Sequence, residues 1–247
     1  SIRANSSADA DTANSQARLD FTSTGDIFTV RTGQENARSA RVRSSLELTV
    51  PRGASVEIRG RDLDIDVADV EGSVDLDANK AGVRLQNIGG KVRSDLRGSD
   101  IIRGFDIRGD VELKGRGRDI ELENIAGQVT IDGGYSGETT LRRIARPVRF
   151  ESNVSKFRLE ALPGELRLTL NQLSVQNATG PLEVDTKSKD IELADINGPI
   201  RVDTERGDVA VRHSTALRHP LEVSVRSGNI DLALPPAATF NLRAETA

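Results

Sequence analysis

The sequence contains no cysteine, methionine or tryptophan, and it has one tyrosine, Tyr135. With no cysteine and only two histidines, it offers no cluster of the side chains that usually hold zinc. No run of about 18 apolar residues occurs, so no membrane-spanning helix is expected. The absence of methionine, in a chain that opens at Ser1, leads us to expect a processed or trimmed piece of a longer protein.

Neither sign of charge dominates the composition. Charged residues make up 29% of the chain, the formal net charge is -4, and aromatic residues make up 3%. Nucleic-acid-binding proteins usually have a basic face with aromatic side chains that stack on bases, so this composition argues against that class. Leucine, isoleucine and valine are plentiful, and they provide a sizeable apolar core for one large domain or two ordinary ones.

A repeat runs through most of the sequence. A glycine or proline followed by alternating apolar residues recurs at intervals of about 16 to 21 residues, centred on 18 or 19. The recurring start positions are Gly53, Gly72, Gly90, Gly109, Gly127, Pro147, Gly164, Pro181, Pro199 and Pro220. The pattern therefore predicts about ten repeats.

Each repeat has two short strands joined by a turn. Alternate residues of the first strand are apolar, as in Val111/Leu113, and a turn with Gly, Asp or Asn leads to a second alternating strand, as in Ile120/Leu122. Alternation with period two buries one face of a strand and exposes the other. Strands of about three to five residues cannot bury their apolar face alone, so the repeats must stack on one another.

We therefore predict an all-β fold, a single-stranded β-solenoid (β-helix) with about ten coils of about 18–19 residues. Right-handed coiling is expected from the general preference of crossovers between parallel strands. The competing folds are a β-sandwich or a β-propeller, which would need longer strands or a period nearer 40 residues.

Outward residues of the first strands carry charges of both signs. In repeat order, the residues between the two apolar positions are Asp75, Arg93, Glu112, Thr130, Arg149, Arg167, Glu183, Arg201 and Glu222. If coils stack about 4.8 Å apart, opposite charges mostly become neighbours along this row. Exposed ion pairs are worth little each, so the row would help to fix the register between coils.

The two ends of the chain differ from the repeats. Residues 1–16 resemble a polar linker, and the alternating segments between Leu19 and Val50 predict a meander or degenerate repeats that cap the solenoid, so residues 1–52 form an N-terminal linker and cap. Residues 53–247 form the predicted repeat domain. Because the segment from Phe240 to Ala244 begins another strand and then stops, we expect this domain to be truncated at its C-terminal end.

Three features carry a resemblance to a known family: the segment Leu46 to Val56 (LELTVPRGASV), the recurrent Gly-Asp-Val/Ile turns, and the segment Leu234 to Phe240 (LPPAATF). Over about residues 17–247 the chain resembles the bacterial β-strand-repeat family of unknown function that is often labelled as adhesins and is related to the head domain of auto-transporter adhesins. The resemblance implies a β-helical, extracytoplasmic or envelope-associated module, often fused or anchored to membrane segments. It supplies no catalytic residues.

Two motifs suggest specific binding but have simpler interpretations. Arg-Gly-Asp occurs at Arg108 to Asp110 and at Arg206 to Asp208, and this tripeptide is typical of integrin-binding adhesins. Both copies lie where the repeat itself places Gly-Asp, so we interpret them as repeat turns. His213 and His219 lie in a long turn without cysteine or histidine partners, and we interpret them as solvated loop histidines rather than metal ligands or catalytic groups.

Three further segments were candidates for a site. Asp62, Asp64 and Asp66 could bind calcium, but the Gly-Gly-x-Gly-x-Asp repeat of calcium-binding β-rolls is missing, so a solvated strand is the preferred interpretation. Gly115 to Arg118 has glycines at alternate positions without a following helix, which argues against a dinucleotide loop. Gly133 to Gly137 breaks the repeat and is the best candidate for a specific surface contact, with an irregular loop as the alternative.

These patterns predict a non-catalytic structural or adhesin-like module of the bacterial cell envelope or extracellular space, without catalytic, cofactor or metal residues. Its expected partners are other copies through the solenoid ends or faces, surface polymers or envelope proteins, and not nucleic acid. Two alternatives stay open. One is a polysaccharide-acting β-helix enzyme, which would need convergent carboxylates in a groove that is often lined by aromatic residues. The other is a sensory or regulatory module of a membrane-anchored protein.

Overall fold

The computed structural model describes residues 2–6, 17–24, 27–34 and 44–236, in two compact units that span residues 1–51 and 52–247. In the first unit β1 (Ile2–Ser6) pairs with β4 (Ser44–Leu48), and β2 (Ala17–Thr24) pairs with β3 (Ile27–Gln34). Both pairs are antiparallel, and β1 pairs with β4 instead of β2, so the described strands of this unit form neither a meander of consecutive strands nor parallel coils. Their role as a cap stays a prediction, and the expected strand at Phe240 to Ala244 lies outside the described residues.

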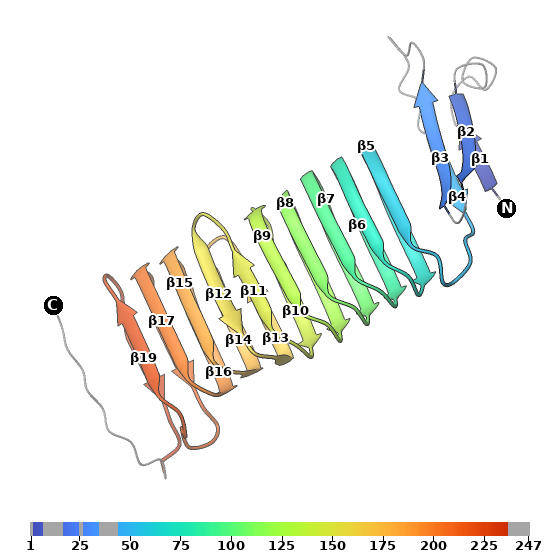
Figure 1. Ribbon diagram of the computed structural model, residues 1–247. Coiled ribbons are helices and arrows are strands. Elements are labelled where there is room, and N and C mark those ends of the chain that lie inside the picture. Colours follow the sequence, from blue (N-terminus) through green and yellow to red (C-terminus); the bar gives the residue numbers. More distant parts are fainter. Residues whose placement is uncertain (1, 7–16, 25–26, 35–43, 237–247) are drawn as a thin grey trace. The chain divides into compact units, whose positions relative to one another are not determined.

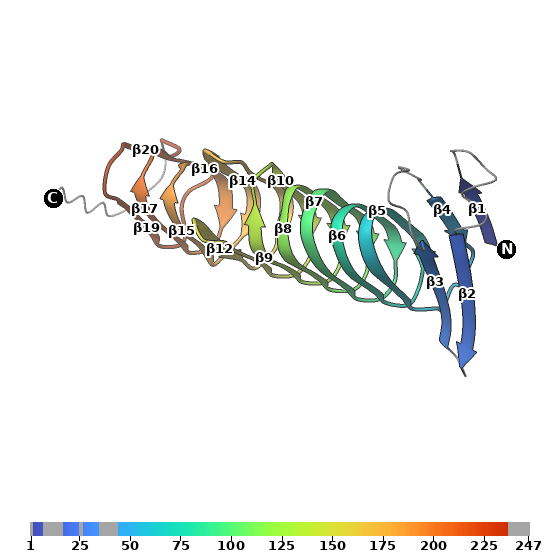
Figure 2. The ribbon, with the colours of Figure 1, turned by 90° about the horizontal axis from the view of Figure 1, so that it is seen from above.

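The second unit is a stack of two-strand coils, drawn from cyan to red in Figures 1 and 2. In the first four coils one bent strand contains both halves: β5 (Val56–Val70), β6 (Val74–Ile88), β7 (Val92–Ile107) and β8 (Val111–Ile125). In the later coils the halves are separate strands: β9 (Val129–Tyr135), β10 (Thr139–Ile144), β11 (Val148–Glu151), β12 (Ser155–Leu159), β13 (Leu162–Leu168), β14 (Gln172–Thr179), β15 (Leu182–Ser188), β16 (Asp190–Asn197), β17 (Ile200–Arg206), β18 (Val209–Arg212), β19 (Leu221–Val225) and β20 (Ile230–Ala233).

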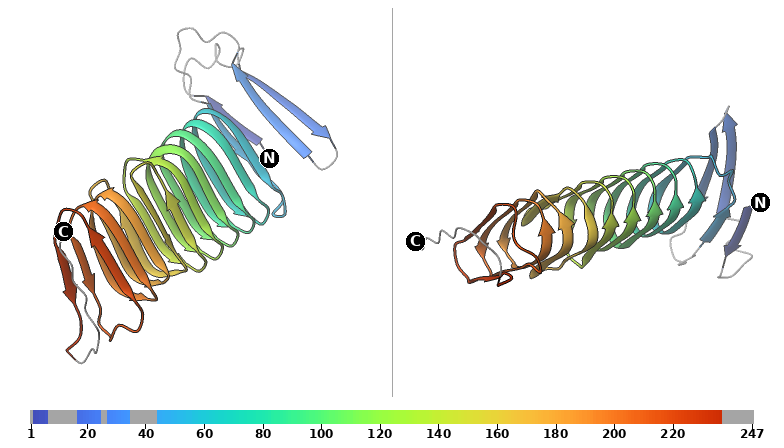
Figure 3. Two further views of the ribbon diagram at one scale, coloured as in Figure 1. Left: turned by 60° about the vertical axis from the view of Figure 1, so that its left-hand side comes forward. Right: turned by 90° about the horizontal axis from the view of Figure 1, so that it is seen from below.

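Successive coils lie in parallel register. Val111 pairs with Val92 of the preceding coil and with Val129 of the following coil, which is the pairing that the repeat predicted. We call the surface formed by the first halves the first face, and the surface formed by the second halves the second face; both can be followed in Figure 3. The predicted all-β solenoid of about ten turns is confirmed. Its handedness stays a prediction.

The apolar residues of both faces point into one continuous core. The residue that closes each coil is buried: Val70, Ile88, Ile107, Ile125, Ile144, Leu162 and Ile196 are 3% exposed or less. Fully burying such a side chain contributes about 1.5–3 kcal/mol. Because each coil is covered by the coils on both sides, this stabilisation depends on stacking.

The residue before the closing position usually takes a left-handed backbone conformation. These residues are Asp69, Asn87, Asp106, Asn124, Arg143, Asn177 and Asp195, with φ between 50° and 58°. Asn and Asp tolerate this conformation better than most residues. Asn87 donates from Nδ2 to Oδ1 of Asp69 (2.6 Å), and Asn124 donates in the same way to Asp106. Alternation of Asp with Asn therefore links neighbouring coils without placing two carboxylates side by side.

One coil runs backwards, which the uniform repeat did not predict. After β11 the chain turns at residues 152–154, and β12 pairs antiparallel with β11; β13 then pairs antiparallel with β10 and β14. The parallel stack resumes when β14 pairs with β16 and β15 with β17. Gly164 lies in β13, so its prediction as the start of a regular repeat was wrong. Figure 1 shows the yellow hairpin of β11 and β12 at one edge of the solenoid.

Two similar turns produce the reversal. Ser152 accepts the backbone N–H of Ser155 with its hydroxyl (3.1 Å), and its own N–H donates to the Ser155 carbonyl (2.9 Å). At the second hairpin Thr169 makes the same two contacts with Gln172, at 3.1 and 2.8 Å. A hydroxyl that bonds the backbone three residues later stabilises a tight turn. The chain therefore turns back at these two points instead of crossing to the other face.

Candidate functional site

The outer surface of the solenoid carries rows of charged side chains that cross from coil to coil. The outer row of the first face contains Glu57, Asp75, Arg93, Glu112, Thr130, Arg149, Arg158, Glu183, Arg201 and Glu222. The prediction of Arg167 in this row was wrong, because the reversed coil places Arg167 on the second face opposite Thr140 and puts Arg158 in the row instead.

Opposite charges meet between coils along this row, as the sequence predicted. Arg93 lies 3.6 Å from Glu112, and Arg201 lies 3.9 Å from Glu222. Arg158 also pairs with Glu183, across an antiparallel pair of strands. Each pair joins two neighbouring strands, so each favours the native register although its contribution to stability is small.

Glu112 is the most strongly bonded carboxylate of the first face. The Nζ atoms of Lys114 and Lys91 lie 2.9 and 3.1 Å from its carboxylate oxygens. The hydrogen bonds from Lys114 and Lys91 lower the pKa of Glu112 from 4.5 to about 2, against the small opposing effect of burial. This cluster joins β7 to β8 and remains charged well into the acid range.

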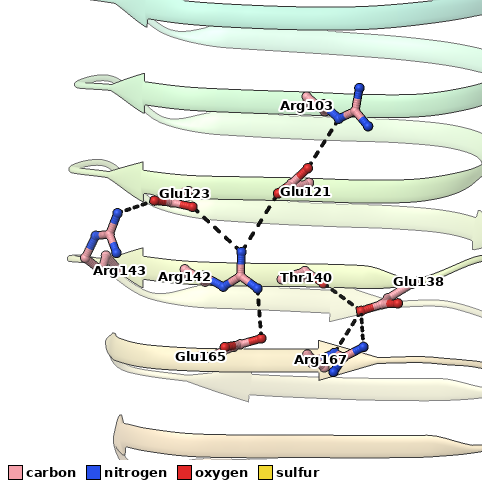
Figure 4. A network of polar contacts seen from close by, with 9 residues as sticks. All are labelled: Arg103, Glu121, Glu123, Glu138, Thr140, Arg142, Arg143, Glu165 and Arg167. Carbon is pink, nitrogen blue, oxygen red and sulfur yellow. Dashed lines mark hydrogen bonds and ion pairs between the residues drawn. The ribbon is translucent and has the colours of Figure 1, made fainter.

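A larger network crosses the second face at the start of the reversed coil (Figure 4). The guanidinium of Arg142, in β10, lies 3.8 Å from both Glu121 and Glu123 of β8, and 3.2 Å from Glu165 of β13. Arg103 of β7 extends the network through Glu121. The network spans four neighbouring strands, and Arg142 links the last regular coil to the reversed one.

Each carboxylate of this network has a cationic partner. Arg143 pairs with Glu123, and Glu138 accepts from Arg167 (2.8 Å) and from the hydroxyl of Thr140 (3.1 Å). The hydrogen bond that Arg142 donates to Glu165 raises the pKa of Arg142. Such oppositely charged pairs between neighbouring strands favour the native register of those strands.

Both Arg-Gly-Asp segments are parts of the stacked turns. Gly109 packs so closely on the backbone of Gly90 that a Cβ would lie 2.2 Å from its carbonyl oxygen, and Asp110 accepts the N–H of Gln128 (2.9 Å) in the next coil. In the second segment Gly207 has φ of 130°, and Asp208 accepts from the N–H of Asn229 (2.8 Å). The Gly and Asp of each segment thus have a structural role between coils.

The two histidines lie apart from the charged rows. Oδ1 of Asp195 accepts the N–H and hydroxyl of Ser214, at 2.7 and 2.8 Å, and these two bonds lower the pKa of Asp195. His213 lies beside Asp195 at the rim of a shallow cavity of about 490 Å³, and burial lowers its pKa. The Ser214 hydroxyl donates its hydrogen to Asp195. It therefore does not donate to His213, as a serine nucleophile would to its histidine base. His219 is exposed, as expected for a loop histidine, whereas His213 is partly buried with a buried Nε2, so the interpretation of His213 as a solvated histidine was wrong.

The family model described as Toastrack DUF4097 matches residues 1–247. The chain belongs to this family. Toastrack DUF4097 is a bacterial repeat family of unknown function. No curated protein and no solved structure matches the chain.

In this Toastrack chain the remaining candidate segments contribute to the coils. Asp64 and Asp66 alternate on the exposed side of β5, and Asp62 lies at its bend, 3.9 Å from Lys80. In the described ranges no three His, Cys, Asp or Glu side chains come together as a metal site. Nor do those ranges contain a helix with the length and apolar character to cross a membrane.

The glycine-rich segments also contribute to this Toastrack stack. Gly115 to Arg118 lies at the bend of β8, and Gly115 packs against the backbone of β7. Tyr135, expected in a surface loop, instead packs against the core, and this burial raises the pKa of its hydroxyl. The segment is anchored by the N–H of Ser136, which donates to the Gly117 carbonyl (3.0 Å). Gly133 to Tyr135 belong to β9, so the alternative of an irregular loop was wrong for these three residues, and a specific surface contact at this segment stays a prediction.

Proposed function

We propose that this Toastrack chain is a non-catalytic module of the bacterial cell envelope or extracellular space, with an adhesin-like role. Its outer rows would contact surface polymers, envelope proteins or other copies of the chain. The observation that best supports this role is the regular outer surface of the solenoid. Coils about 4.8 Å apart present charged side chains at constant spacing along each face. Such a surface suits a partner that repeats along its own length.

The filled interior supports the same function. Phe150 and Phe157 stack at 4.9 Å between ring centroids inside the reversed coil, and both are at most 2% exposed. The cavity beside His213 is shallow and lies outside this core. Ligand pockets are typically concave and mostly apolar, whereas the extended surface of this protein consists of two charged faces.

Cosedimentation of the purified chain with isolated bacterial envelope material tests this proposal. We expect the protein to sediment with the envelope fraction and to be released by about 0.5 M salt, because contacts through exposed charges are screened. Labelling of intact cells with a membrane-impermeant reagent gives its location. A protein that stays strictly monomeric, does not sediment with envelope material and is shielded in intact cells would contradict the proposed role.

A further inference from the structure

The last outward row of the first face, just before the bend in each coil, is rich in arginine. Arg61, Asn79, Arg97 and Arg116 are successive partners along the ladder of β5 to β8. Lys80 and Arg118 lie one and two residues beyond this row. We call the five exposed cations Arg61, Lys80, Arg97, Arg116 and Arg118 the arginine edge.

Much of the positive charge of this edge is not neutralised. Lys80 and Arg97 reach Asp62 and Asp77 only at 3.9 and 3.8 Å. Within residues 49–236, for which side chains are described, Arg61, Arg116 and Arg118 form no ion pair. The carboxylate of Asp119, at the same bend, is engaged by the N–H of Glu138 (2.8 Å). Asp100 lies at the bend of β7, and Asp95 and Asp132 lie in the neighbouring outward row, where both are ladder partners of Lys114.

Arg97 and Arg116 are also direct neighbours on parallel strands. Neighbouring strands lie about 4.8 Å apart, and like charges in this arrangement repel each other. On the second face Arg84 and Arg103 are also direct neighbours, but Arg103 is paired with Glu121. Arg142, farther along that face, lies among three carboxylates. A row of like charges in which Arg61, Arg116 and Arg118 form no ion pair within residues 49–236 is suited to a ligand that brings several anions at the same spacing.

We propose that the arginine edge binds a linear anionic surface polymer with a fixed negative charge about every 5 Å, the spacing of the coils. This inference rests on the proposed function and specifies its partner chemistry. Guanidinium groups bind carboxylate and phosphate through paired hydrogen bonds, so both acidic polysaccharides and phosphate polymers fit. The edge ends at Gly134, the next partner of Arg116, and therefore covers four coils, or about 14 Å of polymer.

Binding of labelled polygalacturonate and polyphosphate to the full chain, measured by fluorescence anisotropy, tests the inference. Polygalacturonate carries carboxylates and polyphosphate carries phosphates, so the two polymers distinguish these groups. Neutral dextran is the control for uncharged polymer, and single-stranded DNA is the control for a nucleic-acid polyanion. We expect at least one of the two polyanions to bind more tightly than DNA, and oligomers with fewer than about four charges to bind weakly. We also expect the double variant Arg97→Gln/Arg116→Gln to lose about tenfold in affinity and to show a smaller salt dependence.

The matched control is Arg146→Gln/Arg218→Gln, which removes two exposed arginines from turns outside the outer rows and leaves the net charge equal to that of the first variant. Equal losses in the two variants, or tighter binding to DNA than to either polymer, would overturn the inference. If wild-type protein binds neither polyanion but still sediments with envelope material, the proposed binding of polyanions by the arginine edge is wrong, while the proposed function is still supported. Thermal unfolding of each variant verifies that the solenoid is intact.

Discussion

The buried hydroxyl group of Ser94 has no hydrogen-bond partner among the described residues, and this allows a prediction about stability. Ser94 is 4% exposed and lies between Leu76 and Leu113 in an inward column, where its hydroxyl has no partner among the described residues. Replacing it by alanine removes an unsatisfied polar group, so Ser94→Ala should leave the free energy of unfolding unchanged or raise it by up to about 1 kcal/mol.

The matched variant for Ser94 is Ser155→Ala. The Ser155 hydroxyl lies 2.9 Å from that of the buried Thr186, so its loss should lower the free energy of unfolding by about 1 kcal/mol. Urea unfolding of both variants measures the difference. Equal destabilisation by the two substitutions would show that the Ser94 hydroxyl has a favourable contact that the packing does not reveal.

The Glu112 cluster should make stability depend on acid. Its folded pKa is about 2, below the ordinary value of 4.5, so its stabilising effect is complete above pH 4.5 and is lost as the pH falls toward 2. We expect wild type to be more stable than Glu112→Gln at pH 7, and the gap to close at low pH. A gap that stays constant from pH 7 to pH 2.5 in urea titrations would contradict this assignment.

Arg142 should be the most important cation of the second face, where it is partly buried. Arg142→Gln leaves Glu121, Glu123 and Glu165 close together, and we expect it to lower the free energy of unfolding by about 1–2 kcal/mol. Arg84→Gln removes a guanidinium that donates to the side chain of Gln86 and forms no ion pair within residues 49–236, so it should cost less than about 0.5 kcal/mol. Similar urea midpoints for these two variants would argue against the network.

At the scale of elements, the reversed coil makes a prediction that a uniform repeat does not. A uniform repeat pairs Arg149 with Arg167, whereas the antiparallel hairpin pairs Arg149 with Arg158. The chain has no cysteine, so engineered thiols are unambiguous. We expect Arg149→Cys/Arg158→Cys to form a disulfide on mild oxidation, and Arg149→Cys/Arg167→Cys to remain reduced. A disulfide in the second variant but not in the first would contradict the reversed coil and favour a uniform parallel repeat.

Much of the solenoid could be predicted because its physical cause is local. Alternation such as Val111/Leu113 marks strands, and recurrence every 18 or 19 residues marks stacking. The reversal could not be predicted in this way, because β12 and β13 alternate as a regular coil does. Its signal is the Ser152 and Thr169 turns, where a hydroxyl replaces the usual Gly-Asp. The row from Asp69 to Asp195 also had a signal, Asn or Asp directly before the closing apolar residue.

The candidate site was less predictable than the fold. Opposite charges along the outer row followed from register alone, as in the pair of Arg93 and Glu112. The Arg142 network did not follow from the register of a uniform repeat, because it joins β8 to β13, which belongs to the reversed coil. The arginine edge depends on which residues precede the bend in four separate coils, and that position is fixed only when the ladder is known.

At the scale of the whole molecule, the solenoid depends on parallel stacking of successive coils, and cross-linking of Asp75 with Arg93 measures this most directly. These residues are paired on β6 and β7, 18 positions apart in sequence, so their Cα atoms should lie about 4.8 Å apart. We predict that Asp75→Cys/Arg93→Cys forms an intramolecular disulfide readily in the native protein, whereas Asp75→Cys/Glu112→Cys, two coils apart, does not. Efficient cross-linking of the second pair without the first would contradict the stacked-coil structure.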